Sequence, residues 1–174
     1  MKLFIFLSLF ISSTTALAQI SEKQKPGYEV GAFLGNFLPN QIDGVTEITP
    51  LSGLRLTLSN ASADTYYEIG VMTGRAYDVE WTNAFLSIAI RYPIESITGI
   101  FYIGGDYHGY KTSVDAPLQS MGGGHIGGAL MTNIRNSLFF RSDMKFNINP
   151  GTSLYFGFSF VFFIPSSGDK EAQP

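Results

Sequence analysis

Two pairs of charged residues at alternate positions could carry acid–base chemistry. Asp106 and His108 are separated by one residue, as are Arg141 and Asp143. Residues at this spacing share one face of a β-strand, where a carboxylate can orient an imidazole as a general base. A serine nucleophile would complete such a site. The same side chains can instead pair as an ion network inside a closed sheet.

A glycine-rich run at residues 122–127 formally matches the G-x-G-x-x-G pattern of dinucleotide-binding loops. That role requires a strand before the glycines and a helix N-terminus after them to hold the pyrophosphate. Residues 128–132 continue a strand pattern instead. We therefore expect no nucleotide cofactor and interpret the glycines as space for side chains that neighbouring strands direct inward.

The composition argues against other classes of site. The chain has no cysteine and two histidines, which fall on different predicted strands without a cluster of carboxylates, so no metal site is expected. A net charge of -3 without a basic block argues against nucleic acid as a partner. The chain is 45% hydrophobic and 14% aromatic, which is not the composition of a disordered protein.

The N-terminus has the pattern of a cleaved signal peptide. Lys2 precedes an apolar run at residues 3–11, which is about half the length that a membrane-spanning helix needs. The small-x-small sequence at residues 16–18 is typical of a cleavage site. We predict a signal peptide at residues 1–18, one folded domain at 19–164 and a disordered periplasmic tail at 165–174.

Downstream of the signal peptide, hydrophobicity alternates with the period of a β-strand. In one segment, apolar and charged residues occupy opposite parities: Leu138, Phe140, Met144 and Phe146 against Arg141, Asp143 and Lys145. Eight such segments of about 9 to 13 residues match the length of tilted membrane-crossing strands. The predicted turns at one rim are residues 59–64, 93–97 and 133–137, and the opposite rim carries residues 39–50, 75–79, 111–120 and 148–151.

The charged parity is expected to face the inside of a barrel. Arginine facing lipid would cost about 2 to 4 kcal/mol near the membrane midplane, and eight strands enclose only enough space for side chains. The predicted interior ion network comprises Glu29, Arg55, Glu68, Arg91, Asp106, His108, His125, Arg141, Asp143 and Lys145. The aromatic residues at strand ends are expected to form two interfacial belts: Tyr28, Tyr67, Trp81, Tyr92, Tyr107, Tyr110 and Phe162.

The last segment resembles the terminal assembly signal of outer-membrane barrels. Its pattern is a tyrosine, then a glycine, then two aromatic residues at alternate positions, here Tyr155, Gly157, Phe160 and Phe162. In that family the signal normally ends the chain, whereas here residues 163–174 follow it. With the export signal and the eight alternating segments, the chain resembles the small barrels of the OmpA transmembrane-domain, OmpX and OmpW-like group.

The resemblance implies a fold, a location and partners. The expected fold is all-β, an eight-stranded antiparallel up-and-down transmembrane β-barrel. The expected location is the outer membrane of a Gram-negative bacterium. The expected partners are membrane lipid, lipopolysaccharide and the barrel-assembly machinery, with a surface ligand at the external loops 39–50 and 111–120.

Three functions stay open at this point. The sequence favours a non-enzymatic envelope protein with a charge-plugged lumen. The alternative is a narrow conduit for small or apolar solutes, as in OmpW-like barrels, favoured by the glycine-rich sixth segment and disfavoured by the ionic interior.

The third function is a lipid-modifying hydrolase. The barrel deacylase PagL carries a His-x-Ser-Asn-Ala motif, and this chain offers Ser59-Asn60-Ala61. Thr57 stands where the motif has histidine, and Ser59 is expected at the rim opposite His108. The sequence therefore disfavours this chemistry.

Overall fold

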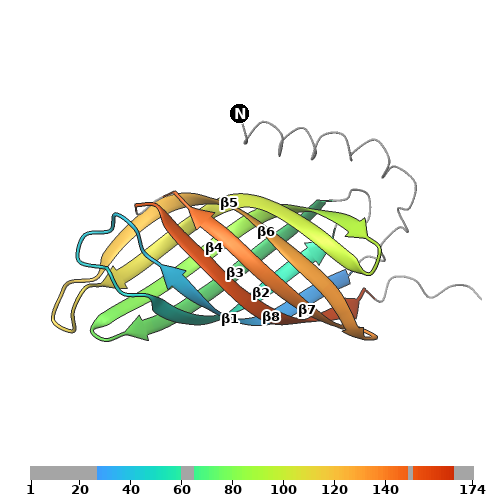
Figure 1. Cartoon of the computed structure of the whole chain (residues 1–174), viewed down its shortest axis with the longest axis horizontal. Helices are drawn as coiled ribbons and strands as arrows, with labels where there is room; N and C mark the ends of the chain where they lie inside the picture. Colours follow the sequence, from blue (N-terminus) through green and yellow to red (C-terminus); the bar gives the residue numbers. More distant parts are fainter. Residues whose placement is uncertain (1–26, 60–64, 149–150, 167–174) are drawn as a thin grey trace, which may run out of the picture.

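The computed structural model describes residues 27–59, 65–148 and 151–166, which form a closed barrel of eight antiparallel strands (Figure 1). Each strand pairs with the next in the chain, and β8 closes the barrel by pairing with β1. This confirms the predicted all-β, up-and-down barrel. The strands are β1 (Gly27–Leu38), β2 (Thr49–Ser59), β3 (Thr65–Ala76), β4 (Val79–Ile94), β5 (Ile97–Lys111), β6 (Gln119–Arg135), β7 (Leu138–Asn147) and β8 (Ser153–Pro165).

Several predicted boundaries fall differently or lie outside the described residues. The predicted signal peptide lies outside them, as does all of the predicted tail except Pro165, which still belongs to β8, and Ser166. Within the described ranges, a helix long and apolar enough to cross a membrane is not found.

Strands β4, β5 and β6 have 16, 15 and 17 residues and exceed the predicted lengths. Pro93 and Ile94 were expected in a turn, but they extend β4 by pairing with β5. The turn is shorter because Glu95 adopts a φ of 53°, and positive φ allows a two-residue hairpin connection. Tyr77 and Asn136 adopt the same conformation in the tight turns after β3 and β6.

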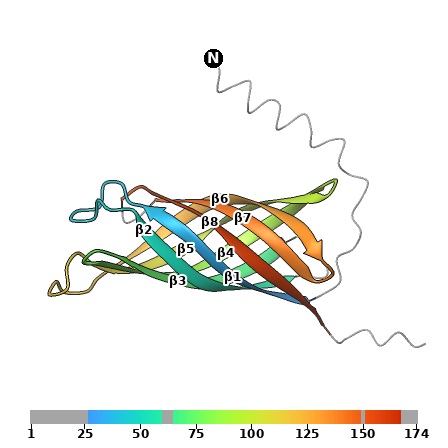
Figure 2. The same cartoon turned by 60° about the horizontal axis from the view of Figure 1, so that its bottom comes forward.

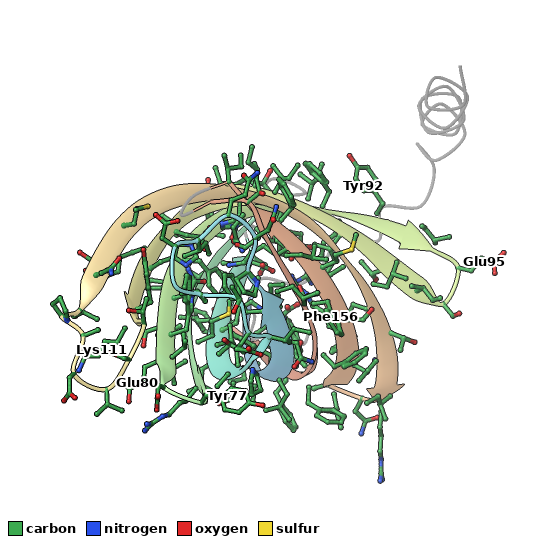
Figure 3. All side chains as sticks on the ribbon, turned by 60° about the vertical axis from the view of Figure 1, so that its left-hand side comes forward. Tyr77, Glu80, Tyr92, Glu95, Lys111 and Phe156 are labelled. Atoms are coloured by element: carbon green, nitrogen blue, oxygen red, sulfur yellow. The ribbon has the colours of Figure 1, made fainter. Side chains whose placement is uncertain are left out.

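The two ends of the barrel differ (Figures 1 and 2). The loop end carries the connections at residues 39–48, 77–78 and 112–118, together with the end of β7 and the start of β8. The terminal end carries the start of β1, the end of β8 and the tight turns after β4 and β6. Figure 3, which views the loop end, shows Tyr77, Glu80 and Lys111 there and Glu95 at the far end.

Side chains alternate between the two faces of the closed sheet. Every strand exposes a large apolar side chain on its outer face: Leu34, Leu54, Ile69, Leu86, Ile103, Leu130, Met144 and Phe158. A contiguous apolar exterior of this kind is unusual for a monomeric soluble protein and matches the lipid-facing band of a transmembrane barrel. The opposite parity of each strand points into the barrel, and its side chains are mostly buried.

Two residues expected in the interfacial belts lie inside the barrel. Trp81 and Tyr110 are 1% and 5% exposed, and their ring centroids lie 4.8 Å apart. The prediction was based on their position at strand ends, and it was wrong because parity decides the face. Trp81 has the same inward parity as Arg91 on β4, and Tyr110 has the same inward parity as Asp106 on β5. The other predicted belt residues are exposed: Tyr28, Tyr67, Tyr92, Tyr107 and Phe162.

The interior position of Trp81 can be tested directly, because it is the single tryptophan of the chain. We predict that lipids brominated on their acyl chains barely quench its fluorescence, since the sheet separates the ring from lipid. The control is the double variant Trp81→Phe/Tyr92→Trp, whose indole replaces an outward tyrosine and is quenched strongly. Equal quenching in the two proteins would contradict the placement.

Candidate functional site: the polar interior of the barrel

The ten predicted network residues all lie buried inside the barrel. Each is at most 7% exposed. Four acidic and four basic side chains are present together with two histidines: Glu29, Glu68, Asp106 and Asp143, Arg55, Arg91, Arg141 and Lys145, and His108 and His125. Burying a charge is costly unless it is paired and hydrogen-bonded, so the contacts of these groups determine what the interior can do.

Strand β7 supplies three charges at consecutive inward positions. Arg141 donates from Nη1 to Glu68 Oε1 at 2.5 Å and from Nε to Asp143 Oδ1 at 2.9 Å. Asp143 also accepts from Arg55 Nη1 at 3.1 Å. These contacts form a chain of four charges, which we call the arginine cluster, linking β2, β3 and β7 through the barrel interior.

A separate ion pair joins β1 to β4. Arg91 donates from both terminal nitrogens to the two carboxylate oxygens of Glu29, each at 2.6 Å. Its guanidinium also lies 4.0 Å from the ring centroid of Tyr66. Bidentate geometry and an aromatic face are the environment that arginine fits best when it leaves water.

Asp106 is the centre of a second cluster, which we call the Asp106 cluster. Its Oδ1 accepts from Lys145 Nζ at 2.8 Å and from Asn83 Nδ2 at 3.0 Å. Its Oδ2 lies 2.6 Å from His125 Nδ1. Lys145 Nζ donates in turn to Asn83 Oδ1 at 2.9 Å. All the strong donors and acceptors here therefore have partners.

His108 does not pair with Asp106, although the spacing suggested it. Same-face neighbours along one strand are about 6.6 Å apart, and His125 on the adjacent strand comes closer to the carboxylate. His108 Nδ1 lies 3.3 Å from Asn83 Nδ2. The imidazole also makes an edge contact with the Trp81 ring, with the ring centroids 5.4 Å apart. The oriented imidazole is therefore that of His125.

Ser87, His125 and Asp106 lie in the order of a serine hydrolase triad. Ser87 Oγ is 2.8 Å from His125 Nε2, and His125 Nδ1 faces Asp106. In a triad this order makes the imidazole a base for the hydroxyl. Catalysis also requires a reacting carbon beside the serine oxygen. Ser87 and His125 are each 1% exposed, so the arrangement orients the imidazole without presenting the hydroxyl to a substrate.

Ser59 has a structural role in the described part of the chain. Its hydroxyl accepts from the backbone N–H of Gly27 at 2.8 Å and donates to the Gly27 carbonyl at 3.0 Å. These two hydrogen bonds link the end of β2 to the start of β1. The two residues that follow Ser59 in the motif lie outside the described residues.

The glycines of β6 lie on both faces of the strand, some toward the barrel interior and some toward its exterior. The ring of Tyr102 occupies the space beside Gly127, as the sequence suggested, so this glycine leaves no gap in the interior. Gly122 and Gly124 were expected to do the same, but they have the outward parity of Ile126, and a Cβ there would lie 4.0 and 3.5 Å from backbone oxygens of β5 and not beside an inward side chain. The whole G-x-G-x-x-G run lies within β6, with strand and not helix after it.

Apolar clusters lie toward the two ends of the barrel interior. The cluster at the loop end contains Phe33, Phe37, Ile42, Val45, Leu51, Met72, Val79, Trp81, Phe85, Tyr110 and Tyr155. The cluster at the terminal end contains Tyr66, Ala89, Ile100, Tyr102, Ala129 and Met131, with Phe139 against it. Between them a cavity of about 20 Å³, lined by Arg55, Glu68, Asp143 and Lys145 among others, has room for about one water molecule.

Sequence reasoning missed the neutral partners of the network. Asn83, Ser87 and Ser159 each bind a charged or imidazole group. The signal was present, because Asn83 and Ser87 share the inward parity of Arg91. Selection by charge alone does not include these neutral side chains.

The predicted assembly signal spans both faces of β8. Tyr155 points inward, where its ring makes an edge contact with Phe33 at 6.2 Å, and Gly157 lies against it. Phe160 and Phe162 point outward. Its role in assembly stays a prediction.

Within the described ranges, a group of three or more histidine, aspartate or glutamate side chains able to hold a metal ion is not found. The carboxylates of the interior bind arginine, lysine, asparagine and histidine instead.

No protein-family model matches the chain, and no curated protein matches its sequence. Solved structures do match. The N-terminal β-barrel domain of OprF from Pseudomonas aeruginosa aligns with a TM-score of 0.65 at 12% identity, covering 80% of this chain and 98% of that one. The chain has the fold of the small eight-stranded outer-membrane β-barrels.

Two further barrels of this fold align over similar lengths. Neisserial surface protein A gives a TM-score of 0.59 at 5% identity and covers 81% of this chain and 97% of its own. The attachment invasion locus protein Ail of Yersinia pestis gives 0.53 at 9% identity, covering 81% and 98%. At these identities the likeness concerns the fold alone.

The isolated Arg91–Glu29 pair allows a clean energetic test. Arg91→Met leaves a buried carboxylate unpaired and is expected to lower the free energy of unfolding by about 3 to 5 kcal/mol. The double variant Glu29→Met/Arg91→Met removes both charges and is expected to lose less. Urea unfolding from lipid vesicles provides the measurement.

Arg75→Met is the matched control, because its pair with Glu80 is about half exposed at both side chains. It should change the free energy of unfolding by less than about 1 kcal/mol. If Arg91→Met is as mild as the control, the buried pair does not have the role described.

The buried serine gives a second prediction. A serine-reactive fluorophosphonate should leave the folded protein unlabelled, because the Ser87 hydroxyl is not presented to a substrate. A known serine hydrolase in the same membranes serves as the positive control. Labelling that disappears in Ser87→Ala would overturn this interpretation.

Proposed function

We propose that the protein is an integral outer-membrane barrel with a non-enzymatic role in envelope structure or surface contact, and that side chains close its lumen. The observation that carries the proposal is the pairing of the interior charges across the barrel, together with the apolar clusters that lie toward its two ends. An ion or solute would have to break these pairs and cross both clusters in order to pass.

The apolar exterior supports the membrane location. Large apolar side chains are exposed on all eight strands, and exposed tyrosines lie near the strand ends at the terminal end, among them Tyr28, Tyr67 and Tyr92. Tyrosines at this height fit the interface between lipid and water. We further propose export by a signal peptide at residues 1–18 and insertion by the barrel-assembly machinery through β8.

The loop end is the proposed contact surface. Tyr77, Val114 and Leu118 are more than half exposed there, in the connections after β3 and β5. Exposed apolar groups outside the sheet favour contact with lipopolysaccharide or another surface ligand. The role of the protein would then lie in this surface, with the barrel as its anchor.

Conductance in planar bilayers separates this function from a conduit. We predict a silent protein, since the arginine cluster and both apolar clusters block the lumen. A steady conductance that changes in Arg141→Ala would show that ions pass through the interior, which would support the conduit and contradict a closed lumen. Arg75→Ala, at the exposed rim, is the control for a general effect of lost charge.

A further inference from the structure

The loop between β1 and β2 covers the mouth of the barrel. Figure 3 shows this loop crossing the loop end in front of the barrel opening. Its Ile42 and Val45 are 7% and 2% exposed, and they join the apolar cluster that contains Trp81. Ile42 and Val45, although they belong to a surface loop, are therefore part of the apolar cluster at the loop end of the barrel.

The aromatic wall of the mouth is a stack of three rings. Trp81 stacks on Phe37 with centroids 4.4 Å apart and on Tyr110 with centroids 4.8 Å apart. Stacked and tilted rings favour a further aromatic partner over an aliphatic one of equal area. The loop nevertheless places isoleucine and valine in this cluster.

The loop is attached by few polar contacts. Among the described residues, its own backbone bond runs from Val45 N to Ile42 O at 3.1 Å. Asn40 Nδ2 donates to Thr152 Oγ1 at 2.6 Å, and this bond is exposed. Ile48 in the same loop is 58% exposed and takes no part in the cluster. The loop also lies close to Gly151, through the backbone of Asn40 and Gln41, and Gly44 lies close to Thr112. Burial of Ile42 and Val45 is its contact with the aromatic cluster.

The ring stack also contains an unused hydrogen-bond donor. Trp81 Nε1 is buried and has no hydrogen-bond partner. A buried polar group without a partner costs free energy and calls for an explanation. Asn147 Oδ1 on β7, at the same end of the barrel, is a buried acceptor that also has no hydrogen-bond partner. Of the three such atoms among the described residues, these two lie toward the loop end, and the third, Arg91 Nε, lies toward the terminal end.

We infer that the mouth is a binding site for a small aromatic molecule with a hydrogen-bond acceptor, such as a phenol, and that Ile42 and Val45 occupy it when it is empty. The ligand ring would replace the two aliphatic side chains in this cluster and meet the edge of the ring stack, because Phe37 and Tyr110 cover the faces of Trp81. Its oxygen would accept from Trp81 Nε1. The inference is independent of the role proposed above, because a ligand bound in the mouth does not need to cross the charged interior.

The single tryptophan makes binding measurable. The probe is 4-nitrophenol, which absorbs tryptophan emission, added to the folded barrel in detergent micelles. We expect saturable quenching of Trp81 in the wild type. The double variant Ile42→Ala/Val45→Ala should bind about tenfold more tightly, because a site that its own loop fills has a lower apparent affinity than an open one.

The control variant is Ile48→Ala, which shortens an exposed side chain of the same loop and should leave the affinity unchanged. Trp81→Phe/Tyr92→Trp reports partition into the micelle, and its quenching should not saturate. Acrylamide quenching independently shows whether the loop has opened. An opened double variant with unchanged or weaker 4-nitrophenol binding would overturn the inference, since the loop would then be only a cover.

A second variant serves if the double variant fails to fold, as judged by loss of its heat-modifiable gel mobility. Asn40→Ala removes the contact between the loop and Thr152 without altering the aromatic wall. It should tighten 4-nitrophenol binding about two- to threefold by raising the open fraction. Increased acrylamide quenching with no gain in affinity would contradict the inference.

Discussion

An eight-stranded barrel leaves no room for solvated charges, and this constraint governs the rest of the structure. Its interior is just wide enough for side chains, so each inward charge must meet a partner across the barrel. Arg141, Asp143 and Lys145 on β7 meet groups from β2, β3, β4 and β5. Because a slip of one residue in register would turn these charges toward lipid, the pairing also fixes the register.

The period of two was enough to predict the barrel and the interior position of the charges. It did not predict their pairing. Asp106 contacts His125, a diagonal neighbour on the next strand, and this contact depends on the register between β5 and β6. Trp81 was misplaced because position at a strand end was given more weight than parity. The lengths of β4 and β5 were missed because the turn uses positive φ at Glu95, which residue type does not signal.

The interior illustrates that distances alone do not define a catalytic site. Ser87, His125 and Asp106 have the order and spacing of a triad. Yet the same close packing that pairs the charges keeps the hydroxyl from a substrate. Contact with outside molecules is therefore expected at the loop end, where the connections between strands carry exposed side chains such as Tyr77, Val114 and Leu118.

The central claim is that the sheet closes around paired charges with its apolar face in the outer membrane. Gel mobility of the protein in isolated outer membranes, compared with and without heating in detergent, tests it most directly. A closed barrel resists unfolding until heated, so the account predicts a band that shifts on heating and is found in that fraction. An unshifted band from a soluble periplasmic protein would contradict it, because the phenylalanines would then have to pack against one another.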